Sequence, residues 1–335
     1  MGAAFARAAL ELAPGLRLLL VEEGGLPNEE GATILAPGVW HAGVPDGQRE
    51  RVEATRARLG GRLNPCGLLE LRPHLAEGFS RAADLWTPEL RRLADPQHLP
   101  FTRLDPGAGT FSPASLTLEN AQAAVRAGAD LMLNARGLPR PDGAELQRLS
   151  VTNTHRVVVD HSLDVMAERV VVAAGAAGPG LVEVGLGALT PHRRAYRQSP
   201  RLNGPSSNRS PVLRAGGFTL RPQGGGYTVI PPIPHPDPWD YRPGGGRLLG
   251  VPVGLRREVL EAMLEMLEAL PALASEALEV GRSLADVPGA WLALPEGGWP
   301  LWELLDASHW LLLGGPNADL TGLAVAEELA RELTR

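Results

Sequence analysis

The sequence predicts an α/β protein in which a β-rich domain interrupts a domain of alternating helices and strands. Three observations support this prediction. Helix-like and strand-like runs alternate through the first half, residues 190–250 are dense in proline and glycine, and a strand followed by a helix ends the sequence. We assign 1–45, 102–190 and 295–335 to the first domain, and 46–101 and 191–294 to the inserted one.

The first residues read as a helix followed by a strand. Residues 3–13 are rich in alanine, carry their apolar positions on one face, and end at Pro14-Gly15. The run LRLLLVEE (16–23) is continuously apolar up to its two acids, which is typical of a parallel strand buried on both faces. This pair is the back half of a strand–helix–strand nucleotide-binding unit.

The remaining elements follow from the same periodicities and breakers. A charged helix is expected over 46–58, and residues 60–100 hold short strands and helices. Residues 112–135 predict a helix with a Ser-Pro start, ended by Gly128 and followed by a strand. The other predicted elements are paired strands at 145–160, a buried strand running into a small-residue turn at 169–181, short antiparallel strands over 190–250, an amphipathic helix at 254–279 broken near Pro271, a strand at 309–315 and a helix at 319–335.

Composition excludes several classes of protein. A net charge of −6 predicts no broad attraction to nucleic acid or to anionic membranes. No apolar run approaches the roughly 20 residues that a bilayer span needs. Cys66 is the single cysteine, which excludes an internal disulfide and a cysteine-rich metal site, so we expect no metal and a reducing cytoplasm. The sequence contains no lysine, which excludes a Schiff-base or P-loop lysine. Nothing in it indicates an oligomeric state.

Three stretches have the chemistry of a ligand site. Glu22 ends the strand at 16–23, where an acid binds ribose hydroxyls or simply caps the strand. Gly175 follows the strand at 169–173 and lets backbone approach a ligand closely, although a tight strand-to-helix turn needs the same residue. A Gly-Gly turn precedes the closing helix, whose start suits an anion or a dipole, with Asp319 as its alternative N-cap.

Taken in order, these stretches resemble the FAD-dependent amino-acid and amine oxidoreductases, the group of D-amino-acid oxidase, glycine oxidase and sarcosine oxidase. The matching segments run along nearly the whole chain: LRLLLVEEGG (16–25), GATILAPGVWHAG (31–43), FSPASLTLENAQAAVRAGADL (111–131), RVVVAAGAAGPGL (169–181), PEGGWPL (295–301) and LLLGGPNADLTGLAVAEELA (311–330). The resemblance implies a glutathione-reductase-type, Rossmann-like FAD domain built from discontinuous segments, with an inserted antiparallel substrate domain. It implies hydride removal from a carbon that bears an amine or a hydroxyl in a small molecule.

The resemblance also assigns residues. Those implied to contact FAD are Gly2, Ala3, Glu22, Glu23, Thr33, Ala174, Gly175, Gly314, Gly315, Asp319, Thr321 and Gly322. Candidates for substrate contact are His41, Arg221, Tyr241 and Trp291. Arg221 lies on a predicted strand of the inserted sheet and suits a carboxylate, with a surface arginine as the alternative. Tyr227, His235 and Tyr241 lie in proline-rich segments that suit a lid over the site, or packing within a loop.

Four features depart from the family's pattern. The opening strand and the first two glycines of G-x-G-x-x-G do not precede Gly2, so either the recorded start lies downstream of the true one or part of the cofactor cradle is missing. The sheet would then lack its central strand and expose apolar faces of its neighbours. Trp291 stands where relatives place a carboxylate-binding arginine, Glu296 replaces an aspartate, and the oxidase lysine is absent.

These departures support a second interpretation beside the flavoenzyme: a non-catalytic or truncated relative with an incomplete cofactor cradle. An NAD-dependent dehydrogenase is a weaker alternative, because it would not predict the closing helix or the β-rich insertion. Oxidase and dehydrogenase activity both stay open at this point.

Overall fold

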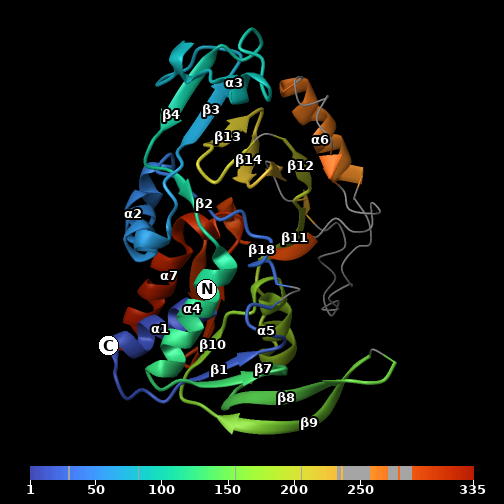
Figure 1. Ribbon diagram of the computed structural model, residues 1–335. Helices are drawn as coiled ribbons and strands as arrows, with labels where there is room; N and C mark the ends of the chain where they lie inside the picture. The colour runs from blue at the N-terminus through green and yellow to red at the C-terminus, as the bar shows by residue number, and fades with distance from the viewer. Residues whose placement is uncertain are drawn as a thin grey trace.

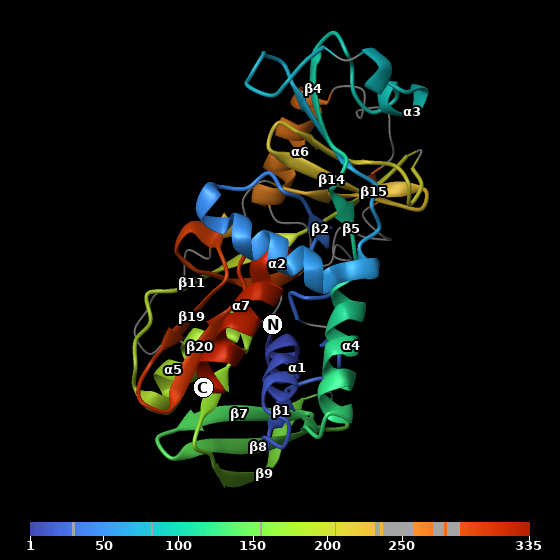
Figure 2. The same ribbon diagram turned by 90° about the vertical axis from the view of Figure 1, so that its left-hand side faces the viewer.

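The computed structural model describes residues 1–28, 31–81, 83–154, 156–204, 206–231, 235–236, 257–270, 278–279 and 289–335. The molecule is long in one direction (Figure 1). A large sheet occupies one end, a three-stranded meander occupies the other, and helices lie between them (Figures 1 and 2). The predicted α/β class with an inserted sheet domain is confirmed.

Three helices form the middle of the molecule. α1 (Gly2–Leu12) packs against both α4 (Pro113–Arg126) and α7 (Ala318–Leu333), and Figure 2 shows the three running side by side. The buried side of α1 is largely alanine, whose small side chains let helix axes approach closely. α2 (Arg49–Leu59) packs on α7 as well, although it falls in a segment assigned to the inserted domain. The domain boundaries therefore stay a prediction.

The parallel strands form two separate sheets. β1 (Leu19–Glu22) pairs with β6 (Asp130–Leu133), whereas β10 (Val170–Val172) pairs with β20 (His309–Leu313), which also pairs antiparallel with β19 (Leu301–Leu304). Among the described residues, no strand joins β1 to β10. β20 has partners on both edges and is buried throughout, but β1, β6 and β10 are only partly buried.

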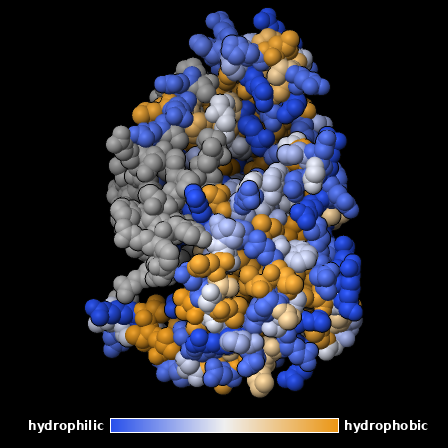
Figure 3. All heavy atoms as spheres, turned by 180° about the vertical axis from the view of Figure 1, so that it is seen from behind, coloured by the Kyte–Doolittle hydropathy of each residue, from blue (hydrophilic) through white to orange (hydrophobic). Residues whose placement is uncertain are grey.

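The prediction of full burial for the strand at 16–23 is therefore wrong. Leu19 is 39% exposed and Leu131 is 38% exposed, because each of their strands has a neighbour on only one edge. β1 and β6 therefore carry apolar side chains that reach the surface. Apolar side chains reach the surface over the lower half of the molecule seen from behind, at the height of these strands and of the meander (Figure 3).

The inserted domain is built on a seven-stranded sheet. Its strands, in spatial order, are β17 (Leu278–Glu279), β12 (Arg201–Asn203), β15 (Gly226–Ile230), β14 (Phe218–Gln223), β13 (Val212–Ala215), β3 (Leu68–Arg72) and β4 (Phe101–Asp105). The prediction of an antiparallel sheet holds except at one pair, since β13 runs parallel to β3. These two strands come from distant segments, so no hairpin forces them to be antiparallel.

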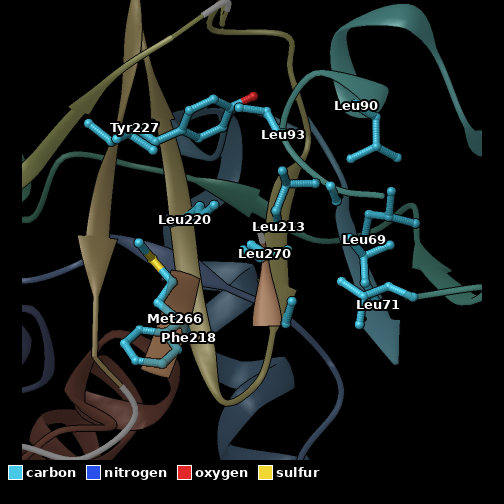
Figure 4. Packing of buried hydrophobic residues seen from close by; sticks show 14 of the residues in the cluster. Leu69, Leu71, Leu90, Leu93, Leu213, Phe218, Leu220, Tyr227, Met266 and Leu270 are labelled. Carbon is cyan, nitrogen blue, oxygen red and sulfur yellow. The ribbon is translucent and has the colours of Figure 1, made fainter. Parts of the chain in front are cut away.

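One face of this sheet carries the largest core. β14 alternates strictly, with Phe218 and Leu220 buried toward the core and Arg221 on the opposite face. Side chains of α3 (Pro88–Arg91) and α6 (Arg257–Ala269) and of the residues after them, among them Leu93 and Leu270, cover the apolar face (Figure 4). Because the apolar face of β14 is buried, Arg221 lies on the other face, where it reaches the Phe111 carbonyl.

Smaller sheets complete the fold. β11 (Arg193–Gln198) pairs antiparallel with β18 (Gly289–Leu294) and with β16 (His235–Pro236), and β2 (Val39–Trp40) pairs with β5 (Gly109–Thr110). The paired strands predicted at 145–160 are part of the meander of β7 (Ala135–Arg140), β8 (Gly143–Val151) and β9 (Val157–Met166). α5 (Gly178–Leu186) follows β10.

The helices predicted at 46–58, after 112 and at 319–335 are confirmed as α2, α4 and α7. The helix predicted at 254–279 is confirmed as α6 over Arg257–Ala269, but its predicted end is wrong, because Leu278–Glu279 form the strand β17. The predicted break near Pro271 lies outside the described residues. Among the helices that the structure describes, none combines the length and apolarity needed to cross a membrane.

Because β20 and β6 are buried to different extents, a leucine-to-alanine substitution should lower the free energy of unfolding by different amounts in the two strands. Leu311 of β20 is 0% exposed, whereas Leu131 of β6 is 38% exposed. We expect Leu311→Ala to lower the free energy of unfolding by about 2–5 kcal/mol and Leu131→Ala by about 1 kcal/mol or less. Urea denaturation of the two variants measures both values, and equal losses would contradict the burial assigned to the two sheets.

Candidate functional site

The ends of three parallel strands and the starts of two helices meet at Met1. A Cβ added at Gly2 would lie 3.1 Å from the Ala173 side chain, which follows β10. Cβ atoms added at Gly314, after β20, and at Gly322, in α7, would lie 3.3 and 3.4 Å from the Met1 sulfur. Since β10 and β20 are paired in parallel, the turns at Gly175 and Gly314 leave the same edge of their sheet.

This meeting point suits a ligand with negative charge and hydroxyl groups. The first turn of α1 has no acidic residue and no side-chain cap. Desolvation lowers the pKa of the Met1 amine, and the nearby Glu22 carboxylate raises it in part. Glu22 Oε1 accepts hydrogen bonds from Asn28 Nδ2 at 2.8 Å and from the Gly24 amide at 3.3 Å. A helix start without counter-charge attracts an anion, and a carboxylate at a strand end binds ribose hydroxyls.

A chain of hydrogen bonds ties the start of α7 to the inserted sheet. The Gly38 amide donates to Asp319 Oδ2 at 2.7 Å, and the Gly38 carbonyl accepts from the Phe111 amide at 2.8 Å. Arg221 Nη2 then donates to the Phe111 carbonyl at 3.1 Å. Gly38 has φ +61°, and an added Cβ would lie 2.2 Å from the Phe111 oxygen. Only glycine fits this position, so the contact between Gly38 and Asp319 of α7 depends on a glycine here.

The N-cap alternative for Asp319 is wrong. The residue before α7 is Asn317, and Asp319 is the second residue of the helix. Its carboxylate is turned to the Gly38 backbone, which supplies the donor that an N-cap would otherwise find in its own helix.

Two arginines interact electrostatically with Asp319. Arg197 of β11 and Arg221 of β14 are both half-buried, and the Nε atom of each has no hydrogen-bond partner in the described part of the chain. Desolvation lowers the pKa of both guanidinium groups, and the Asp319 charge raises both. With Asp319 ionised, the three groups carry one net positive charge. Partly desolvated guanidinium groups with unused donors are a binding site for a carboxylate.

The pKa of the Asp319 carboxyl group lies close to neutral pH. Desolvation raises the pKa of its carboxyl group to about 6, against the amides of Gly38 and Val39 and the two guanidinium groups, which lower it. The net charge of the cluster therefore changes close to neutral pH.

A second polar cluster surrounds His41, directly after β2. Arg214 Nη2 lies 3.0 Å from His41 Nε2, and Arg214 also pairs with Glu70 at 3.1 Å. Arg103 binds the other oxygen of Glu70 at 2.6 Å. Burial, followed by the Arg214 charge, lowers the pKa of His41 to about 4. His41 is thus a neutral imidazole that accepts from Arg214, which leaves the proton on Nδ1.

Several residues assigned by the resemblance are engaged elsewhere. Glu23 pairs with Arg136 of β7. Thr33 lies in the turn at 32–35, where its carbonyl accepts from Ala36 at 3.4 Å, and no contact in the described chain links it to Met1 or Asp319. Ala3 is buried in α1, where it packs rather than presents a polar group. These three give no support to a role in ligand binding.

Four further assigned residues lie after β10, after β20 or in the first turn of α7. Ala174 and Gly175 follow β10, and a Cβ added at Gly175 would meet open space. Gly315 lies against Pro295, where an added Cβ would come within 2.9 Å. The Thr321 hydroxyl is buried in the first turn of α7, without a hydrogen-bond partner in the described chain.

Trp291 packs against an aromatic and a cationic side chain. It lies on β18, its ring centre is 5.0 Å from that of Tyr196, and the Arg194 guanidinium lies 4.5 Å from its ring centre. These contacts give no support to a role in substrate binding. Tyr241 lies outside the described residues, as does the side chain of His235. The lid role for Tyr227 is wrong, because it is 2% exposed in the core of the large sheet and its burial raises the pKa of the phenol to about 12.

Arg197 and Arg214 were not proposed from the sequence. Each is a half-buried arginine on a strand whose other residues are mostly buried, and nothing in the local sequence distinguishes it from a structural arginine. A surface cavity of about 600 Å³ lies along β6, between Leu19 and Arg148, and none of its lining residues belongs to the Asp319 cluster. The site is therefore defined by its polar contacts.

Comparison with known proteins shows a family and a shared fold. A family model described as FAD dependent oxidoreductase matches residues 1–288. The search of curated proteins finds no match. Glycine oxidase from Bacillus cereus ATCC 14579 superposes with a TM-score of 0.69 at 15% identity, over 99% of this chain and 92% of that one.

Two further solved structures are similar to the same extent. L-amino acid deaminase from Proteus vulgaris gives a TM-score of 0.67 at 15% identity, over 99% of this chain and 91% of that one. L-proline dehydrogenase from P. horikoshii gives 0.65 at 15% identity, over 99% and 90%. Identities this low support the shared fold and nothing finer.

The close packing around Gly38 predicts that a larger residue destabilises the protein at this position but not at an open glycine. We expect Gly38→Ala to lower the free energy of unfolding by at least about 2 kcal/mol, because alanine at positive φ is strained and its Cβ collides with the Phe111 carbonyl. Gly47→Ala is the matched control, since an added Cβ there meets nothing within 4 Å. Urea denaturation distinguishes the two, and a neutral Gly38→Ala variant would refute the contact.

His41 predicts a dependence of stability on pH. Its folded pKa of about 4 lies below the unfolded value of about 6.5, so the unfolded chain binds the proton more readily. Its contribution is present above pH 6.5 and is lost as the pH falls toward 4. The difference in free energy of unfolding between the wild type and His41→Gln should therefore be larger at pH 7 than at pH 4.5. A constant difference would show that His41 titrates normally.

Proposed function

The chain belongs to the family of FAD-dependent oxidoreductases, and we propose that it oxidises a small amino acid or 2-hydroxy acid whose carboxylate binds at Arg221 and Arg197. The observation that carries the proposal is the pair of partly desolvated guanidinium groups beside the start of α7, with Nε donors unused in the described chain. A small amine without a carboxylate would leave both of them unpaired.

FAD fits the residues at Met1. The start of α1, which lacks an acidic residue and a side-chain cap, suits the pyrophosphate, and Glu22 suits ribose hydroxyls. The first turn of α7, with Gly314 and Gly322 at Met1 and the buried Thr321 hydroxyl, suits the flavin end. Bound FAD supplies the acceptor for the hydride.

The residues of this chain bind and orient the substrate. A carboxylate that takes two donors from a guanidinium group is held in one plane, which fixes the carbon next to it. Arg221 is itself fixed by its hydrogen bond to the Phe111 carbonyl, and Phe111 is fixed by Gly38. The positive end of the α7 dipole favours negative charge that develops near it during the reaction.

Arg221 supports this function better than a non-catalytic role. Trp291 takes the place of the arginine clamp, which favours a non-catalytic relative, but Arg221 and Arg197 supply the same kind of donor from strands of two different sheets. The substrates named for the solved neighbours, glycine, other amino acids and proline, all carry a carboxylate, which is consistent with the proposal.

The proposal is tested by spectroscopy and kinetics. Protein loaded with FAD should absorb in the flavin region and lose that absorbance under anaerobic conditions when mixed with one of a panel of small amino acids and 2-hydroxy acids. We expect Arg221→Gln to raise KM for that substrate about 10- to 100-fold, the loss of one or two charge-assisted hydrogen bonds.

Arg209→Gln is the matched control, because Arg209 is exposed on a loop of the same sheet. An unchanged KM in Arg221→Gln would refute the carboxylate site. A protein that takes up no FAD would leave the non-catalytic alternative.

A further inference from the structure

The Arg197–Arg221 site already contains a carboxylate. Asp319 lies in the first turn of α7, is held by the Gly38 amide at 2.7 Å, and acts electrostatically on both guanidinium groups. The described chain contains no side-chain hydrogen bond or ion pair to Asp319. Its partners are backbone amides, so its charge reaches the arginines across space rather than through a fixed ion pair.

The charged groups that act on one another here come from four parts of the fold. Asp319 belongs to α7, Arg197 to β11, Arg221 to β14, and the Cys66 thiol precedes β3. Both guanidinium groups stay protonated over the physiological range. Among the groups of this cluster in the described part of the chain, Asp319 is the one whose pKa is shifted to about 6.

A substrate carboxylate brings a second negative charge to this cluster. Two carboxylates in one partly desolvated site repel each other, and one of them then keeps a proton. A bound substrate is fixed by its bidentate contacts with guanidinium groups, whereas Asp319 is held by neutral amides. Asp319 is thus the carboxylate that gains the proton.

We propose that Asp319 is the internal counter-charge of the Arg197–Arg221 site, and that a carboxylate ligand binds there together with one proton from solvent, which Asp319 takes up. This rests on the function proposed above. Asp319 balances part of the arginine charge in the empty site and becomes neutral when the ligand supplies the balance.

The sign of the pH dependence follows. Below about pH 6, Asp319 is protonated in the free protein and the ligand meets two uncompensated arginines. Above that pH the ligand must draw a proton from an increasingly dilute supply, so its affinity falls by as much as tenfold for each pH unit. KM for the substrate should rise in the same window.

The test measures binding without turnover. Acetate is titrated into the FAD-loaded protein by calorimetry at pH 5.5 and pH 7.5, each in two buffers with different ionisation enthalpies. We expect binding roughly 10-fold weaker at pH 7.5, with uptake of about one proton per acetate at pH 7.5 and much less at pH 5.5. Asp319→Asn should remove both effects and bind at pH 7.5 about as tightly as the wild type does at pH 5.5, because the asparagine oxygen still accepts from Gly38 while its charge is gone.

Controls separate the possible failures. Asp142→Asn, in the exposed turn between β7 and β8, should behave as the wild type. Equal acetate affinity at both pH values, without proton uptake, would overturn the role of Asp319 and leave the carboxylate site standing. Absence of acetate binding at either pH would overturn the carboxylate site, and this inference with it.

A second readout does not depend on the stability of the variant. The infrared difference spectrum of the wild type on addition of acetate at pH 7.5 should gain the band of a protonated carboxyl group. Its absence from the wild type would also refute proton uptake by Asp319.

Discussion

The backbone of Gly38 connects the two halves of this molecule. Its amide holds Asp319 at the start of α7, and its carbonyl holds Phe111, whose own carbonyl holds Arg221. The two peptide groups thus hold the Asp319 carboxylate of α7 and, through Phe111, the Arg221 guanidinium group of the seven-stranded sheet at fixed places. Positive φ and the close approach of Phe111 restrict the position to glycine.

Charge placed at this junction explains the chemistry that the site offers. The start of α1 has no acidic residue and no side-chain cap, which suits an anionic ligand, and Arg197 and Arg221 are the groups that we propose for an anionic substrate. Each group is partly removed from water, so each gains from a partner of opposite charge. Asp319 moderates the second site alone. In the second polar cluster, Arg103 and Arg214 both pair with Glu70, which offsets part of their charge.

Much of the fold could be predicted from the sequence because it depends on local periodicity. The alanine-rich pattern of α1, the Ser-Pro start of α4 and the apolar runs of β10 and β20 each contain their own signal. Burial of β1 was mispredicted, since burial of a strand depends on a second neighbour that the run itself does not specify. The parallel pairing of β3 with β13 depends on distant segments in the same way.

The same distinction applies to the residues of the candidate site: those with a local signal were proposed from the sequence, and those whose role depends on distant segments were not. Arg221 was identified because it stands at a polar position of a predicted strand, and Gly314 and Gly322 because glycine before and within a helix start has a known use. Gly38, Arg197 and the orientation of Asp319 were not, because each acquires its role from a residue far away in the sequence.

The most direct measurement is a crystal structure of the protein with FAD and acetate bound. The account predicts FAD between the starts of α1 and α7, and acetate within hydrogen-bonding distance of both the Arg197 and Arg221 guanidinium groups. Acetate bound elsewhere, or FAD held at a different edge of the molecule, would contradict it.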